Sequence, residues 1–311
     1  MQGLVMKSTG SWYLVKAENG AILECRLKGK IRLDDRKTTN PVAVGDIVDL
    51  QLDKDGSNQI INIHKRKNYI IRKSINLSKQ AHIIASNLDQ AILVATLVAP
   101  RTSLGFIDRF LVTAEAYGIN AKIVFNKCDV LDAEMIELQN DIIHLYTSIG
   151  YECYSISSFN KDDVEKIKLL LKDKTTLLSG HSGVGKTTLV NAIDNNLDLK
   201  TGDISSVHLK GMHTTTFAEL FPLSFGGNII DSPGIKELGL VEMKKEEVGH
   251  YFPEIRDLMN DCKFNNCLHV NEPSCAILKA VEEGVISSER YQSYLGILNG
   301  EEMDWKEWEI R

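Results

Sequence analysis

The chain has 311 residues, of which 43% are hydrophobic and 25% charged, and its net charge is -6. This length and balance are typical of a folded protein of about two or three domains and argue against extended disorder. The longest apolar runs, such as residues 91–99, fall far short of the roughly 20 residues of a membrane helix, and the N-terminus lacks the apolar core of a secretory signal. We therefore expect a cytoplasmic protein with no membrane partner.

The charge is unevenly distributed along the chain. Residues 1–80 contain 15 lysines and arginines against 8 acidic residues, a balance of +7, whereas residues 81–311 have a balance of -13. A basic segment joined to an acidic body indicates a polyanionic partner for that segment, although a solvated charged face would give the same count.

Residues 1–68 are expected to form a small β-barrel. Short alternating runs separated by turn formers such as Asn19-Gly20 and Asp55-Gly56 favour closely spaced strands. These runs cover residues 11–17, 21–29, 44–52 and 59–65. Such a barrel binds irregular RNA through a basic groove with aromatic stacking, and strand alternation leaves at most one of Trp12 and Tyr13 available for stacking.

Residues 69–239 are expected to form an α/β domain. From about Ala81, apolar strand runs alternate with helical segments, which is the signature of a parallel sheet covered on both faces. The predicted strands are residues 90–98, 121–125, 151–157, 175–179, 217–224 and 228–231, and the predicted helices are 103–118, 133–150, 161–171 and a helix that follows Gly185.

The run GHSGVGKTT, between a predicted strand and a predicted helix, matches the phosphate-loop pattern G-x-x-x-x-G-K-[ST]. Its glycines let backbone N–H groups approach phosphate oxygens, and the helix N-terminus adds partial positive charge. We expect Lys186 to reach the β and γ phosphates and the Thr187 hydroxyl to bind Mg²⁺. The residues assigned to nucleotide binding here are Gly180, His181, Ser182, Gly183, Val184, Gly185, Lys186, Thr187 and Thr188.

A second motif, NKCD at residues 126–129, indicates guanine. The Asn126 amide can meet the O6/N7 edge of the base, and the Asp129 carboxylate can accept from N1–H and the exocyclic amine, which adenine does not offer at those positions. The stem of Lys127 can cover the face of the base. The loop at Ser157 and Ser158, after the next strand, can offer a backbone N–H to O6.

A third motif, DSPG at residues 231–234, follows the apolar run of another strand. Asp231 can hold Mg²⁺ through water, and the Gly234 N–H can bond the γ-phosphate. In the preceding polar stretch, Thr215 is the expected Mg²⁺-ligating threonine, and Thr214 and Thr216 are alternatives. These threonines could also belong to a solvated loop that binds no metal.

The residue that activates water is harder to assign. Ile235 stands where many GTPases carry a glutamine that orients the attacking water, so intrinsic hydrolysis should be slow. His213 is the candidate for this role, although a loop histidine is also commonly solvated or in contact with RNA. The expected catalytic residues are therefore His213, Lys186 and Thr215.

Near the C-terminus, Cys262, Cys267, His269 and Cys275 lie within fourteen residues. Three thiolates and an imidazole form the soft ligand set of a closed tetrahedral Zn²⁺ site, and four protein ligands leave no open position, so the ion should be structural. The alternative is free cysteines near a surface histidine. We expect residues 240–311 to form a helical zinc-binding module.

The order of the motifs is itself informative. In ordinary small GTPases the phosphate loop precedes NKxD, whereas here NKCD comes first, so the α/β domain is expected to be circularly permuted. The order NKCD, GHSGVGKT, HTTT, DSPG and cysteine cluster resembles the RsgA (YjeQ) family, the circularly permuted GTPases of bacterial ribosome assembly, over essentially the whole chain. Met212 departs from that family, which more often has Arg before HTTT.

The resemblance implies an N-terminal OB-like barrel, a central permuted P-loop GTPase domain and a C-terminal zinc module. It also implies hydrolysis of GTP to GDP and phosphate, stimulated by the small (30S) ribosomal subunit during late maturation, with contacts to its rRNA. GTP or GDP, Mg²⁺ and one Zn²⁺ are the expected ligands, and the chain is expected to be a monomer. Two alternatives are an RNA-binding assembly module with GTP as a structural ligand, and an ATP-dependent enzyme, which Asp129 disfavours.

Overall fold

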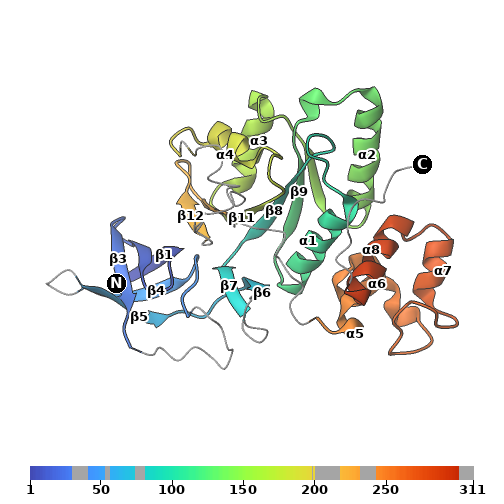
Figure 1. Ribbon diagram of the computed structural model, residues 1–311, viewed down its shortest axis with the longest axis horizontal. Helices are drawn as coiled ribbons and strands as arrows, with labels where there is room; N and C mark the ends of the chain where they lie inside the picture. The colour runs from blue at the N-terminus through green and yellow to red at the C-terminus, as the bar shows by residue number, and fades with distance from the viewer. Residues whose placement is uncertain are drawn as a thin grey trace, which may run out of the picture.

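The computed structural model describes residues 1–29, 41–52, 57–73, 81–197, 199, 218–231 and 243–300. These residues form an N-terminal barrel, a central sheet with helices on both faces and a C-terminal helical module (Figure 1). Within these ranges, no helix combines the length and apolar character needed to cross a membrane.

The barrel is a closed sheet. Its strands are β1 (Gln2–Ser8), β2 (Tyr13–Ala17), β3 (Ile22–Leu27), β4 (Ile47–Gln51) and β5 (Asn58–Ile63). They pair in the order β1-β2-β3-β5-β4, and β4 pairs with β1 to close the barrel. Alternation along β2 buries Tyr13, whereas Trp12 is 43% exposed and lies under the Arg26 guanidinium, 3.9 Å from its ring centre. One aromatic of the pair therefore remains accessible, as expected.

Strand β1 was not predicted from the sequence, and neither was the separate antiparallel pair β6 (Tyr69–Lys73) and β7 (Ala81–Ser86). In β1 the register shifts between Val5 and Lys7, so that Val5 and Met6 are both buried. The β6–β7 pair shifts register between Ile70 and Ile71. Such bulges break the alternation that reveals a strand in the sequence.

The central sheet contains five parallel strands, in the order β10 (Glu152–Ser155), β9 (Ala121–Phe125), β8 (Gln90–Ala95), β11 (Thr175–Ser179) and β13 (Asn228–Asp231). The antiparallel strand β12 (Glu219–Pro222) follows at the edge. Every residue of β8 is buried, as is typical of a central strand covered on both faces.

Two hydrophobic clusters cover the two faces. Ala91 and Leu93 of β8 pack with α1 and α2, whereas Ile92 and Val94 pack with α3 and α4. These helices are α1 (Leu104–Ala116), α2 (Ala133–Ser148), α3 (Lys161–Leu171) and α4 (Lys186–Ile193). Ser103, Asp132 and Asn160 cap the first three by accepting backbone N–H bonds, which fixes where each begins.

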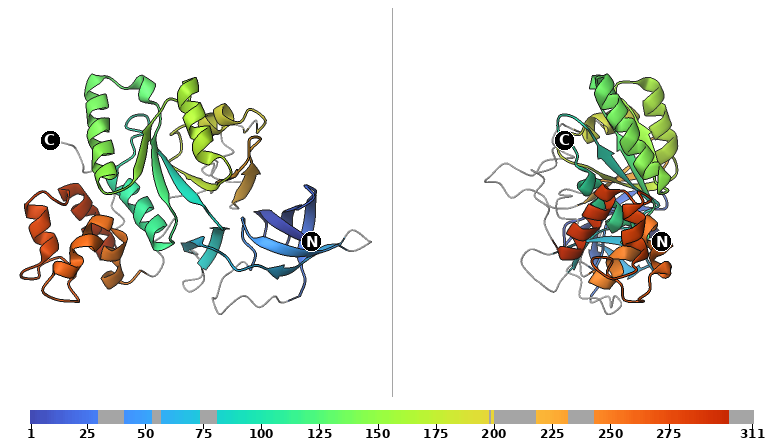
Figure 2. Two further views of the ribbon diagram at one scale, coloured as in Figure 1. Left: turned by 180° about the vertical axis from the view of Figure 1, so that it is seen from behind. Right: turned by 90° about the vertical axis from the view of Figure 1, so that its right-hand side faces the viewer.

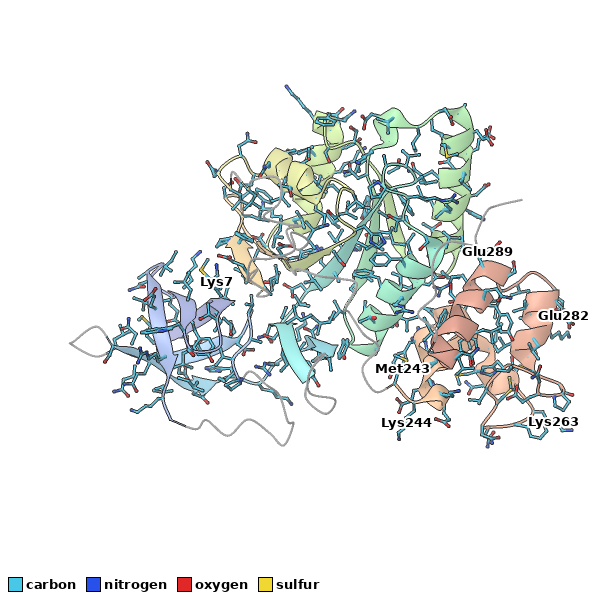
Figure 3. The ribbon with its side chains drawn as sticks, in the orientation of Figure 1. Lys7, Met243, Lys244, Lys263, Glu282 and Glu289 are labelled. Carbon is cyan, nitrogen blue, oxygen red and sulfur yellow. The ribbon has the colours of Figure 1, made fainter. Side chains whose placement is uncertain are left out.

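The barrel joins the central sheet at its β12 edge. Lys7 of β1 pairs in register with Glu219 of β12, and the Lys7 ammonium lies 2.7 Å from the Glu219 carboxylate. Figure 3 shows Lys7 on the side of the barrel that faces β12. The barrel strands thus continue the strand order of the central sheet.

The C-terminal module packs beside α1, as the left view in Figure 2 shows. Its helices are α5 (Lys245–Val248), α6 (Pro253–Leu258), α7 (Ala276–Glu282) and α8 (Ser288–Asn299), with 3-10 turns at Gly249–Tyr251 and Met259–Asp261. Val112 of α1 belongs to the same buried cluster as Phe252, Ile277 and Tyr294. The module therefore shares its hydrophobic core with the α/β domain.

Candidate nucleotide and metal sites

The phosphate loop turns between β11 and α4 on three glycines with positive φ. Gly180, Gly183 and Gly185 have φ of 146°, 86° and 93°. A Cβ at Gly185 would lie 2.5 Å from the Asn126 side-chain nitrogen, so this position requires glycine for space as well as for conformation. Ser182, Gly183 and Thr188 are exposed, whereas Val184 and Thr187 are buried.

Lys186 begins α4, with its side chain folded across the loop. Its ammonium donates to the carbonyl oxygens of Gly180 at 2.7 Å and His181 at 2.8 Å, and the residue is 5% exposed. Burial lowers the pKa of Lys186 to about 8, and the nearby Asp231 carboxylate opposes that shift. The ammonium is thus held at the loop, with backbone carbonyls as its partners.

Asp231 ends β13, next to β11, and carries a buried oxygen that has no partner in the described part of the chain. Its Oδ1 accepts no hydrogen bond from the described residues. The buried hydroxyl of Ser179, on β11, also has no hydrogen-bond partner among them. Burial raises the pKa of Asp231 to about 7, with Lys186 lowering it and Glu219 raising it further. An orphaned buried carboxylate oxygen fits a cation.

The Asn126 side chain fastens three loops together. Its Nδ2 donates to the Val184 carbonyl at 2.9 Å, and its Oδ1 accepts from the Ser158 N–H at 3.2 Å and the Ser158 hydroxyl at 2.9 Å. Asn126 is 2% exposed. The sequence predicts contact between this amide and the edge of the base, whereas in the structure both its nitrogen and its oxygen are bonded to protein.

Lys127 also crosses from the NKCD loop to the phosphate loop. Its φ is 65°, and its ammonium donates to the carbonyls of Ala99 at 2.5 Å and Gly183 at 2.8 Å. Asp129, two residues on, is exposed and has no hydrogen bond or ion pair with the described residues. Its carboxylate is thus open to a ligand.

The serine loop after β10 is tied down by side chains. The Ser157 N–H donates to Asp163 Oδ2 at 3.0 Å, and the Ser158 N–H is bonded to Asn126. A base oxygen would therefore have to compete for these N–H groups, and the longer bond, that of Ser158, is the easier to replace.

The remaining sequence-predicted residues, His213, Thr215 and Gly234, lie outside the described residues. Two residues that the sequence reading did not single out contact the phosphate loop. Pro100 lies 3.3 Å from where a Cβ of Gly183 would stand, and the Phe106 ring centre lies 3.8 Å from that of His181. These contacts come from distant segments, so no local pattern could have revealed them.

The C-terminal cluster brings together all four expected metal ligands. The ligand atoms of Cys262, Cys267, His269 and Cys275 lie within 4.8 Å of one another. The Cys262 and Cys275 sulfurs lie 3.5 Å and 3.4 Å from His269 Nδ1, and 3.8 Å from each other. Ligand bonds of about 2.3 Å for sulfur and 2.0 Å for nitrogen around a tetrahedral ion imply separations close to these.

The surroundings of the cluster also suit a metal. Burial lowers the pKa of His269, which keeps the imidazole neutral and able to coordinate. The Tyr291 hydroxyl donates to the His269 carbonyl at 2.7 Å, and the Tyr294 hydroxyl to the Leu268 carbonyl at 2.7 Å. These bonds hold the ligand segment on α8.

Together, these features define a circularly permuted P-loop GTPase. The NKCD, serine and phosphate loops follow β9, β10 and β11, and Asp231 ends β13, so all four meet at the carboxyl edge of one parallel sheet. The sequence matches the family described as RsgA GTPase over residues 63–241 and the RsgA N-terminal domain over residues 2–60.

Similar proteins cover almost the whole chain. A protein of Flavobacterium johnsoniae, named small ribosomal subunit biogenesis GTPase RsgA, is 54% identical over 98% of this chain and 95% of its own. A protein of the same name from Bacteroides fragilis is 54% identical over 97% of each chain. The crystal structure of YjeQ from Thermotoga maritima matches with a TM-score of 0.78 and 34% identity, covering 96% of this chain and 97% of that one.

The crystal structure of YloQ, described as a circularly permuted GTPase, matches with a TM-score of 0.74 and 32% identity, covering 96% of this chain and 94% of that one. The chain belongs to the RsgA GTPase family and is a GTP hydrolase. Membership implies a guanine nucleotide and Mg²⁺ as ligands.

A Gly185→Ala substitution tests the phosphate loop. The new Cβ would overlap the Asn126 amide and occupy a left-handed conformation, so we expect GDP affinity measured by calorimetry to fall by about tenfold or more. Gly118→Ala is the matched control, since Gly118 has φ of 62° but nothing within 4 Å of the new atom. Equal GDP affinities for the two variants would contradict the proposed loop.

Proposed function

We propose that this GTP hydrolase acts on the small ribosomal subunit during its late maturation, with hydrolysis to GDP and phosphate stimulated by that subunit. The observation that carries the proposal is the match, along nearly the full length of both chains, to proteins named small ribosomal subunit biogenesis GTPases. The proposal takes residues 1–68, 69–239 and 240–311 as the barrel, the GTPase domain and the zinc module of a cytoplasmic monomer.

The barrel is the proposed rRNA-binding part. Residues 1–68 hold 12 lysines and arginines against 8 acidic residues, a balance of +4, and Trp12 presents an exposed ring with Arg26 stacked on it. A ring and a guanidinium that are both accessible can stack on unpaired bases. Residues 236–311 hold 9 basic against 16 acidic residues, which makes the C-terminal module unsuited to a general RNA clamp.

The guanine nucleotide is proposed to lie along the carboxyl edge of the sheet. Asp129 accepts from N1–H and the exocyclic amine, the stem of Lys127 covers the base, and Ser158 lies beside O6. Asn126 is proposed to act chiefly by fixing these loops to one another, since its amide already spans the Val184 carbonyl and Ser158. The N–H groups of residues 180–188 surround the phosphates.

Lys186 is the proposed partner of the β and γ phosphates, which would replace the loop carbonyls around its ammonium. Thr187, Asp231 and Thr215 are the proposed holders of Mg²⁺, which when bound neutralises phosphate charge and aligns the phosphate chain. The orphaned Asp231 oxygen supports this assignment. Gly234 is the proposed sensor of the γ-phosphate.

Activation of water is proposed to depend on the partner. Ile235 has no group that can orient a water molecule, so His213 is the proposed positioning group once the subunit is bound. His213→Ala should then lower subunit-stimulated kcat without changing GTP affinity.

The four ligands of the C-terminal cluster are proposed to hold one structural Zn²⁺, which the zinc content of the purified protein tests.

The test of the proposed function is GTP hydrolysis titrated with purified small ribosomal subunits. We expect a low basal rate that rises and saturates with subunit concentration, while large subunits leave it unchanged. A rate indifferent to small subunits would contradict the proposal. If the subunits bound tightly without any such rise, the RNA-binding role with GTP as a structural ligand would replace it.

An Asp129→Asn substitution tests base recognition. The NH2 group of an asparagine would face the exocyclic amine of guanine, and two donors cannot bond to each other. The same NH2 group can donate to the C2 carbonyl of xanthine, while the amide oxygen still accepts from N1–H. We expect GTP affinity to fall by about 100-fold or more, with affinity for xanthosine triphosphate rising in its place. A variant that kept its preference for GTP in competition assays would exclude Asp129 from the base site.

Nucleotide affinity should depend on pH in a bell-shaped way. With Lys186 at a pKa of about 8, its ammonium discharges as the pH rises through that value and phosphate binding weakens. With Asp231 at a pKa of about 7, its carboxylate protonates as the pH falls and Mg²⁺ binding weakens. GDP affinity should therefore be highest between these values, and chelation of Mg²⁺ should abolish the acid limb alone. An affinity that is flat from about pH 6 to 9 would contradict both assignments.

A further inference from the structure

The first two turns of α1 lie between the phosphate loop and the C-terminal module. On one side, the Phe106 ring packs on the His181 ring with centres 3.8 Å apart and planes inclined by 30°. Phe106 is 7% exposed and belongs to the hydrophobic cluster beneath the central sheet. The ring is therefore fixed by its own packing, and His181 of the loop rests on it.

On the other side, Asp108 faces the C-terminal module. Residues two apart on a helix point in nearly opposite directions, so Phe106 and Asp108 face different neighbours. The Asp108 carboxylate is fully buried and accepts from Arg290 Nη1 at 2.7 Å and from the Tyr146 hydroxyl at 2.7 Å.

Arg290 of α8 completes a buried ion cluster. It is 1% exposed, and besides Asp108 it donates to the two carboxylate oxygens of Glu254 on α6 at 2.7 Å and 3.1 Å. Buried charges of this kind tolerate only the arrangement that pairs them, since a shift of either helix would leave a charge without a partner. The cluster therefore sets the position of α1 against both α6 and α8.

The same helices hold the metal cluster. Tyr291 and Tyr294 of α8 donate to the carbonyls of His269 and Leu268, and Cys275 lies in the buried cluster shared with Val112 of α1. The module, the ion cluster and α1 thus form one continuous packed unit that ends at the phosphate loop.

We propose that Phe106 is a positioning residue for the phosphate loop. The buried Asp108–Arg290 ion pair fixes the C-terminal module against α1, and α1 in turn supports the phosphate loop through Phe106. The inference rests on the nucleotide-binding role proposed above for residues 180–188. The metal module then contributes to nucleotide affinity without touching the nucleotide, because it fixes the helix on which the loop rests.

The test compares GDP affinity in single variants of the full chain, with zinc content measured for each. Phe106→Leu removes the ring but keeps an apolar side chain, and should weaken GDP binding by about three- to tenfold, the worth of an aromatic pair, with zinc retained. Phe106→Tyr keeps the ring and should bind GDP with the affinity of the wild-type protein. Hydrogen exchange at residues 180–186 should rise in the leucine variant and not in the tyrosine variant.

Asp108→Asn tests the transmission from the module. It should weaken GDP binding in the same direction and raise exchange at residues 180–186. Its matched control is Arg256→Ala, because Arg256 of α6 also pairs with α1, at 3.1 Å from Glu115, but through side chains that are 45% and 27% exposed. An exposed pair contributes little, so GDP affinity should be unchanged in this control.

The outcomes separate the claims. If the wild-type protein failed to bind GDP, the proposed nucleotide site itself would be wrong. If the wild type bound GDP and Phe106→Leu bound it equally well, Phe106 would have no positioning role. Suppose that Phe106→Leu weakened GDP binding but that Asp108→Asn, folded and loaded with zinc, did not. The link to the module would then be overturned. Equal GDP affinities for Asp108→Asn and Arg256→Ala would overturn it as well.

Discussion

The Asn126 side chain is the contact on which the nucleotide site depends. It joins residues that are 58 and 32 positions away along the chain, and it needs a donor for the Val184 carbonyl and an acceptor for the Ser158 N–H and hydroxyl. A carboxylate lacks the donor and an ammonium lacks the acceptor, so an amide is the group that fits. Because the amide is buried and both its nitrogen and its oxygen are bonded to protein, the three loops share one arrangement. The NKCD loop and the phosphate loop are thus held in register by a side chain rather than by their order in the chain.

This constraint explains how the site tolerates circular permutation. Parallel strands present their carboxyl ends at one edge of the sheet whatever their connections, so β9, β10, β11 and β13 deliver their loops to the same place. What the permutation changes is which elements flank the site. The barrel joins the edge at β12 through Lys7 and Glu219, and the C-terminal module packs on α1. The site therefore lies in a domain that is in contact with both neighbouring parts of the molecule.

The sequence predicted most of the parts but few of their contacts. Helix α3 was predicted with the bounds Lys161–Leu171 because its apolar spacing is a local signal, and the structure shows that Asn160 caps it at that start. The clustering of Cys262, Cys267, His269 and Cys275 was predicted for the same reason, since their spacing and soft ligand atoms can be read from a short segment. Strands β1, β6 and β7 were missed because bulges disturb their alternation. The bonding of Asn126 and the Phe106–His181 contact depend on distant segments meeting, which no window of sequence reports.

The most direct test of this nucleotide site is a crystal structure of the protein with GDP and Mg²⁺. In that structure we expect the Asp129 carboxylate to accept from N1–H and the exocyclic amine of guanine, and the Lys186 ammonium to leave the Gly180 carbonyl for the β-phosphate. The Asn126 bridge from Val184 to Ser158 should persist. A base that lay away from Asp129, or an Asn126 side chain released from both loops, would contradict this arrangement.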